Sequence, residues 1–138
     1  MTPEETSLAR LLVALPGFKC TSGLLVRSGF RAIRIQCEPI EGATARTPDE
    51  ALRLIQYLGA VPDLHDPATA GILLGMLPRR HLSARDWDVY EVTVYDCPPL
   101  AGSVVHSGPH GTAKWWTVSG GSLGVAAARA LVAIGRAS

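Results

Sequence analysis

Apolar positions recur at helical spacing in three segments, and each segment opens on the same kind of start signal. Thr2-Pro3, Thr47-Pro48 and Asp66-Pro67 place a capping side chain directly before a proline. A cap residue followed by proline at the first helical position is typical of a helix N-terminus. The apolar residues that follow are spaced three and four apart, which predicts three short amphipathic helices, over residues 2–15, 47–58 and 66–77.

Alternation of apolar and polar residues marks a strand with one face on the core. Ile33, Ile35 and Cys37 alternate with polar residues after a Ser28-Gly29 turn, which predicts a hairpin whose first strand covers residues 24–27. Residues 88–95 alternate in the same way. Shorter β-rich runs follow at 104–105 and 113–118, and an alanine-rich helix after Ser122 closes the chain.

The predicted order is α-β-β-α-α-β-β-α, which favours an α+β fold in which a small antiparallel β-sheet is covered by three to four helices. A chain of 138 residues is one domain's worth. The polar, Gly/Pro-containing stretch 38–47 is expected to be a loop, or a seam between an N-terminal helix and hairpin and a C-terminal α-β-β-α part. The apolar faces predict a core that includes Leu11, Leu15, Ile33, Ile35, Ile55, Leu73, Leu77, Val92, Val94, Leu131 and Ile134.

Composition excludes several classes of protein. Hydrophobic residues at 47% and charged residues at 18% exclude disorder and coiled coil. A formal net charge of +1 gives no reason to expect nucleic acid or an anionic membrane as partner. No apolar run approaches the ~20 residues of a membrane span, and the acidic start lacks the positive charge of a signal peptide. We therefore expect a soluble, cytoplasmic protein.

One region combines phosphate-binding groups with rings that stack on a base. Histidines and a lysine lie beside two tryptophans, and a glycine-rich turn before the last helix offers backbone N–H groups. Two arginines after the third helix add an anion-binding fork. The alternatives are helix capping by the turn serines, a plain loop, and complementation of a helix dipole by the arginines. The predicted ligand-binding residues are Arg80, Arg85, His106, His110, Lys114, Trp115, Trp116, Ser119, Gly120, Gly121 and Ser122.

Motifs for catalysis and metal binding are missing from the chain. It has no P-loop spacing, no dinucleotide-binding glycine pattern and no nucleophile elbow. His106-x-x-x-His110 has ligand-like spacing with Cys97 as a third group, but nothing fixes the remaining ligand. The three cysteines include no C-x-x-C pair. We assign no catalytic residue and expect neither a metal nor a cofactor.

The stretch Pro62-Asp63-Leu64-His65-Asp66-Pro67-Ala68-Thr69-Ala70-Gly71-Ile72-Leu73-Leu74 resembles a segment of small phage and prophage proteins from GC-rich bacteria. The helix–strands–helix order over residues 66–135 is similar to that of the phage ABA-sandwich domain family. The resemblance implies a phage setting, and the host cytoplasm as compartment. It brings no catalytic motif with it.

Two hypotheses of function follow from these observations. The first is a phage-type accessory binding protein without turnover, which counteracts a host system by sequestering a nucleotide-like small molecule or by binding a host defence protein. The alternative is a small enzyme that acts on a phosphorylated or nucleotide substrate through His65, His106 or His110. The small predicted sheet would leave an open edge, and much apolar surface needs cover, so we also expect a homodimer.

Overall fold

The computed structural model describes residues 1–36, 47–77, 80–85, 89–95, 104–107 and 114–135, and between 80 and 117 it describes the backbone. In these ranges the chain forms four helices, α1 (Pro3–Val13), α2 (Pro48–Leu58), α3 (Pro67–Gly75) and α4 (Leu123–Ile134). The strands are β1 (Leu25–Ser28), β2 (Arg31–Arg34), β3 (Val61–Pro62), β4 (Arg80–Arg85), β5 (Val89–Tyr95), β6 (Val104–Ser107) and β7 (Lys114–Gly120).

The first three helices begin where the capping pattern predicts. The side chains of Thr2, Thr47 and Asp66 each accept a hydrogen bond from the backbone N–H three residues later, at 3.2, 3.2 and 2.9 Å. Each cap satisfies one of the N–H groups that a helix start leaves without an intrahelical partner. The proline after each cap is tolerated because its position needs no N–H donor.

The strands form two antiparallel sheets. The smaller has the order β2-β1-β3, and the larger has the order β4-β5-β7-β6. A two-residue turn joins β1 to β2, and Gly29 at its first central position has φ 60°. Such tight hairpin turns require a positive φ there, which glycine adopts without steric cost.

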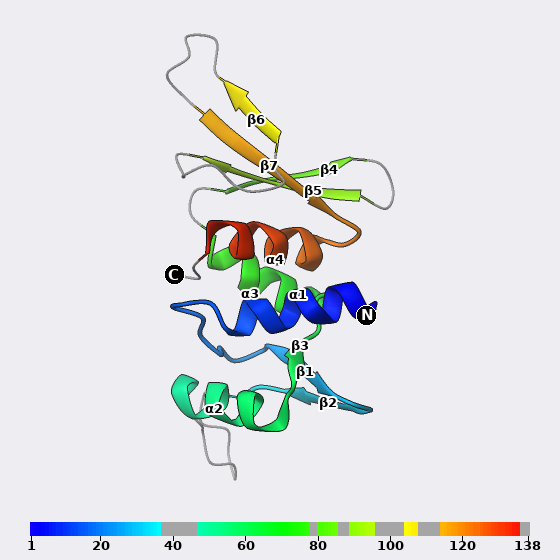
Figure 1. Cartoon of the computed structure of the whole chain (residues 1–138), viewed down its shortest axis with the longest axis vertical. Helices are drawn as coiled ribbons and strands as arrows, with labels where there is room; N and C mark the ends of the chain where they lie inside the picture. Colours follow the sequence, from blue (N-terminus) through cyan, green and yellow to red (C-terminus); the bar gives the residue numbers. More distant parts are fainter. Residues whose placement is uncertain (37–46, 78–79, 86–88, 96–103, 108–113, 136–138) are drawn as a thin grey trace.

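The elements stack in layers, as Figure 1 shows. The four-stranded sheet covers one side of α4, and α1 and α3 pack on the other side. The three-stranded sheet is the next layer after α1, which contacts it at β3. Helix α2 lies on the far side of this sheet. Ala126, Ala127 and Ala128 are fully buried, so α4 fills the central layer with small side chains that let its neighbours approach closely. None of the described helices is long and apolar enough to cross a membrane.

The α+β class with antiparallel strands is confirmed, but the strands form two sheets instead of one. Two strands were not predicted. β3 has only two residues, and β4 coincides with the basic stretch after the third helix, where apolar alternation is weak. Pairing with β5 along the whole of β4 decides its conformation, because strand formation depends more on neighbours than on intrinsic propensity. The proposed seam at 38–47 lies almost entirely outside the described residues.

Most of the predicted core is confirmed. The buried members are Ile35, Ile55, Leu73, Leu77 and Leu131, and the half-buried members that pack against them are Leu15, Ile33 and Ile134. Val92 and Val94 lie on β5, where side chains are not described. The prediction that Leu11 belongs to the core is wrong, because its side chain is 56% exposed. Helix α1 turns Ala9, Leu12 and Val13 inward, and this spacing leaves Leu11 on the outer side.

Candidate functional site

The larger sheet divides the predicted ligand-binding residues between its two ends. His106 lies opposite Trp115, and Arg80 shares a cross-strand row with Trp116, with one residue of β5 between them. Lys114 begins β7 at the same end. The backbone register therefore brings the tryptophans, one histidine, the lysine and one arginine to one end of the sheet. His110 lies outside the described residues.

The remaining predicted residues lie at the opposite end. Arg85 pairs with Val89 there, and β7 ends at Gly120, opposite Tyr90. Gly120 lies six residue steps along the extended strand from Lys114, which corresponds to about 20 Å. One phosphate group cannot bridge that distance, so the lysine and the glycine-rich turn do not form a single phosphate site.

The glycine-rich turn has a structural role at the start of α4. Ser122 caps the helix by accepting a hydrogen bond from Val125 N–H at 3.2 Å, and its hydroxyl donates to the carbonyl oxygen of Leu64 at 3.3 Å. A Cβ on Gly124 would lie 1.9 Å from the same oxygen. The capping alternative is thus confirmed for Ser122. The Leu64 carbonyl lies directly against the start of α4 at Ser122 and Gly124. The exposed Ser119 accepts a hydrogen bond from Arg129 at 2.9 Å through its carbonyl.

The segment Pro62–Asp66, from the last residue of β3 to the N-cap of α3, joins three other elements through charged side chains. Asp63 accepts a hydrogen bond from Arg27 of β1 at 2.6 Å. Asp66 accepts two from the guanidinium of Arg34 at 2.7 and 3.1 Å, the paired geometry in which arginine binds carboxylate most strongly. His65 Nε2 lies 2.5 Å from a carboxylate oxygen of Glu5 on α1. This segment is the junction of the smaller sheet with α1 and α3.

The ion pairs keep these carboxylates charged. The hydrogen bonds from Arg34 lower the pKa of Asp66 to about 2, against the opposing effect of burial. Burial raises the pKa of Asp63, but hydrogen bonds from Arg27 and from the N–H of His65 outweigh it and leave the pKa below its usual value. The hydrogen bond from His65 lowers the pKa of Glu5. At neutral pH all three are acceptors with occupied partners, which suits structural pairing better than proton transfer.

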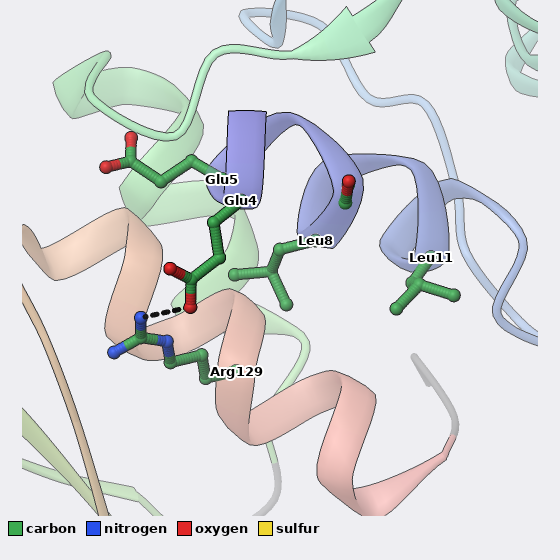
Figure 2. A pocket seen from close by; sticks show the side chains of 6 residues that line it. Glu4, Glu5, Leu8, Leu11 and Arg129 are labelled. Carbon is green, nitrogen blue, oxygen red and sulfur yellow. Dashed lines mark ion pairs between the residues drawn. The ribbon is translucent and has the colours of Figure 1, made fainter. Parts of the chain in front are cut away.

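A groove of about 240 Å³ lies between α1 and α4 (Figure 2). Leu8 and Leu11 line its apolar part, and Glu4 and Arg129 point toward one another across it, 3.6 Å apart. Glu5 points away from Arg129 in this view. Because Glu4 is 85% exposed, this ion pair contributes little to stability. Arg129 also holds the carbonyl of Ser119, so the groove offers a small apolar surface and no unengaged charge for a ligand.

A second hollow brings His65 and Ser122 to one surface. A catalytic serine needs a base within hydrogen-bonding distance of its hydroxyl. Among the described contacts, the Ser122 hydroxyl is engaged by Leu64 and Val125, and the His65 ring by Glu5. Within the described ranges there is also no cluster of three metal-ligating side chains. The described residues therefore offer the enzymatic hypothesis no assembled nucleophile and base.

Three exposed apolar side chains lie on the β1–β2 turn and on the last turn of α2. Phe30 at the turn is fully exposed (108%), Tyr57 is 87% exposed and Leu58 is 42% exposed. The Ser28 hydroxyl donates to the carbonyl of Leu58 at 3.2 Å, which holds the hairpin turn against this end of α2. We call Phe30, Tyr57 and Leu58 the hairpin-end patch.

Sequence reasoning missed the hairpin-end patch, although a signal was present. Helix α2 buries Ala51 and Ile55, four residues apart, and a residue two positions after Ile55 lies about 200° around the helix from it. Tyr57 is an aromatic residue at this outward position, so the spacing could have predicted its exposure. The helical spacing of apolar residues in 47–58 also predicts a buried Leu58, which instead is 42% exposed at the end of α2.

Comparisons with known proteins identify no relative of this chain. No family model matches it, and neither a curated protein nor a solved structure shows a significant match. The resemblance to phage proteins and to the phage ABA-sandwich domain family therefore stays a prediction.

Proposed function

We propose that this protein acts by binding a partner protein, without turnover, through the hairpin-end patch. The carrying observation is the exposure of Phe30 on the β1–β2 turn and of Tyr57 on the last turn of α2, two segments that the hydrogen bond from Ser28 to Leu58 joins. Burying an aromatic side chain removes about 150–250 Å² from water, at roughly 25 cal/mol per Å². Aromatic residues of this kind dominate the energetics of protein interfaces. A host defence protein is one such partner.

The absence of turnover is supported by the way the described ionisable groups are used. Asp63, His65 and Asp66 each pair with a side chain from a different element. Displacing any of them toward a substrate would break a contact that joins layers of the fold. A binding role leaves these contacts intact, because the hairpin-end patch contains none of these groups.

We expect substitution of the hairpin-end patch to weaken binding. The probe is a displayed library of random 16-residue peptides, selected on the full-length chain. Selected peptides should lose at least tenfold in affinity for a Phe30→Ser/Tyr57→Ser variant, because two apolar anchors are removed. Both side chains are exposed, so the melting temperature should stay close to that of the wild type.

The matched control is Leu11→Ser, which removes an exposed apolar side chain on α1, away from the hairpin. Peptides bound through the hairpin-end patch keep their affinity for this variant. Equal affinity for the wild type and the double variant, or a selection that enriches no peptide, contradicts the proposal.

A second candidate function is the sequestering of a nucleotide-like molecule at the Lys114 end of the larger sheet. The register that places His106 opposite Trp115, and Arg80 in one row with Trp116, favours it. Arg80→Ala or Lys114→Ala should weaken binding of purine nucleotides about tenfold to a hundredfold, measured by calorimetry. Arg85→Ala, on the same strand at the opposite end, should not. Wild-type chain that binds no purine nucleotide contradicts this candidate.

A further inference from the structure

Among the described strands, β2 is an outer strand of the three-stranded sheet, and only alternate residues of it bond to β1. The N–H of Ile35, just after β2, donates to the carbonyl of Leu24 at 2.8 Å. Since inward bonding falls on every second residue, the N–H and C=O groups of Ala32 and Arg34 face away from β1. They present a short row of backbone donors and acceptors at the sheet edge.

The register on β1 supports this alternation. Leu25 lies opposite Arg34. Its N–H donates to the Thr69 hydroxyl at 3.0 Å, and its carbonyl accepts from Asp63 N–H at 2.8 Å, both on the side away from β2. Leu25 therefore uses neither backbone group on Arg34, whose own groups point outward.

The edge carries positive charge. Residues 19–36 contain Lys19, Arg27, Arg31 and Arg34 and no acidic residue. Two of these arginines are neutralised by aspartates of the Pro62–Asp66 segment. Arg31 is exposed at the start of β2 and has no acidic partner among the described residues. An approaching segment thus meets the charge of Arg31 at the start of this strand.

From this juxtaposition we infer that the partner docks as an extended acidic segment, which adds a strand to β2. The inference rests on the proposed function and names the chemistry of the partner. Main-chain hydrogen bonds at Ala32 and Arg34 supply affinity, as in other complexes formed by strand addition. A carboxylate opposite Arg31 supplies charge complementarity, and an apolar residue covers Phe30, which directly precedes Arg31.

A second copy of the chain fits this edge poorly. Each copy would bring the exposed Arg31 to the new strand pair, because Arg34 of each copy is already neutralised by Asp66. Like charges on adjacent strands are destabilising. The occupant favoured by charge is therefore an acidic segment from another protein.

Ala32→Pro tests the backbone contact. Proline removes the outward N–H at Ala32, while the β1–β2 bonds fall on its neighbours, and proline is tolerated at a strand edge of this kind. We expect the affinity of peptides selected on the wild-type chain to fall at least tenfold, with a melting temperature within about 4 °C of the wild type. Unchanged affinity in the folded variant overturns strand addition.

A second measurement does not depend on how the variant folds. Each backbone nitrogen of a selected peptide is methylated in turn, and binding to the wild-type chain is measured. An added strand loses affinity only at alternate positions, because only every second N–H faces β2. Losses without a period of two overturn the inference.

The charge contact is tested by Arg31→Glu, with Arg53→Glu on the exposed side of α2 as the matched control. The selected peptides should contain Asp or Glu, and Arg31→Glu should weaken them at least tenfold more than the control does. If Arg31→Glu and Arg53→Glu change peptide affinity equally, the inference of an acidic partner is overturned. Peptides that lose affinity for Phe30→Ser/Tyr57→Ser but not for Ala32→Pro overturn the inference and keep the proposed function. Peptides indifferent to both variants overturn both.

Discussion

Gly124→Ala is expected to destabilise the fold by at least about 3 kcal/mol, although alanine is normally the better helix residue by about 1 kcal/mol. The added Cβ would lie 1.9 Å from the carbonyl oxygen of Leu64 and 2.8 Å from its carbon. Both neighbours are backbone atoms of the junction segment, so neither can move aside as a flexible side chain does. The melting temperature should fall by roughly 10 °C or more, measured by calorimetry.

Gly121→Ala is the matched control for this substitution. A Cβ at Gly121 has no atom within 4 Å, and the residue is not among the glycines with positive φ. We expect a change of no more than about 0.5 kcal/mol there. Equal melting temperatures for the two variants would contradict the close packing of α4 on the Leu64 carbonyl.

Asp66→Ala is expected to cost about 1–3 kcal/mol in denaturant unfolding. It removes the cap of α3, worth about 0.5–2 kcal/mol, and the paired hydrogen bonds from Arg34, which are discounted because that arginine is 46% exposed on its side chain. Asp66→Asn can still cap the helix and should cost less. Thr47→Ala, which removes only the cap of α2, should cost about 1 kcal/mol. A loss at Asp66 no larger than that at Thr47 would contradict the joining role of the aspartate.

The same aspartate predicts how stability changes in acid. Its folded pKa of about 2 lies below the usual 3.8, so its contribution is complete above about pH 4. The contribution is lost as the pH falls toward 2, because the unfolded chain takes up the proton first. The difference in stability between the wild type and Asp66→Ala should therefore shrink between pH 4 and pH 2. A difference independent of pH over that range would contradict the ion pair.

Local signals in the sequence predicted the helix starts and the hairpin, because each depends on residues within a few positions of one another. Thr2, Thr47 and Asp66 cap helices through groups three residues away. The joining role of the Pro62–Asp66 segment was not predictable in this way. Its partners lie 32 to 60 residues away along the chain, and only the packed layers bring them together.

The ligand-binding prediction shows the same difference between local signals and the arrangement of distant residues. The residue types in 106–122 suit an anionic ligand with a base, but spacing along a strand does not reveal that β7 separates Lys114 from the turn by its whole length. The hairpin-end patch was missed for a related reason. Phe30 looks like the first residue of a buried strand, and only the turn at Gly29 places it outside the sheet.

Amide hydrogen exchange of the full-length chain, alone and with a selected peptide, tests the central claim most directly. In the free chain the amides of Arg31 and Ile33 should be protected by β1, whereas those of Ala32 and Arg34 should exchange rapidly. Binding should slow Ala32 and Arg34 at least tenfold and leave residues 104–107 and 114–117 unchanged. Unchanged exchange at Ala32 and Arg34, with slower exchange in β6 and β7, would contradict binding at the hairpin end and favour the ligand site on the larger sheet.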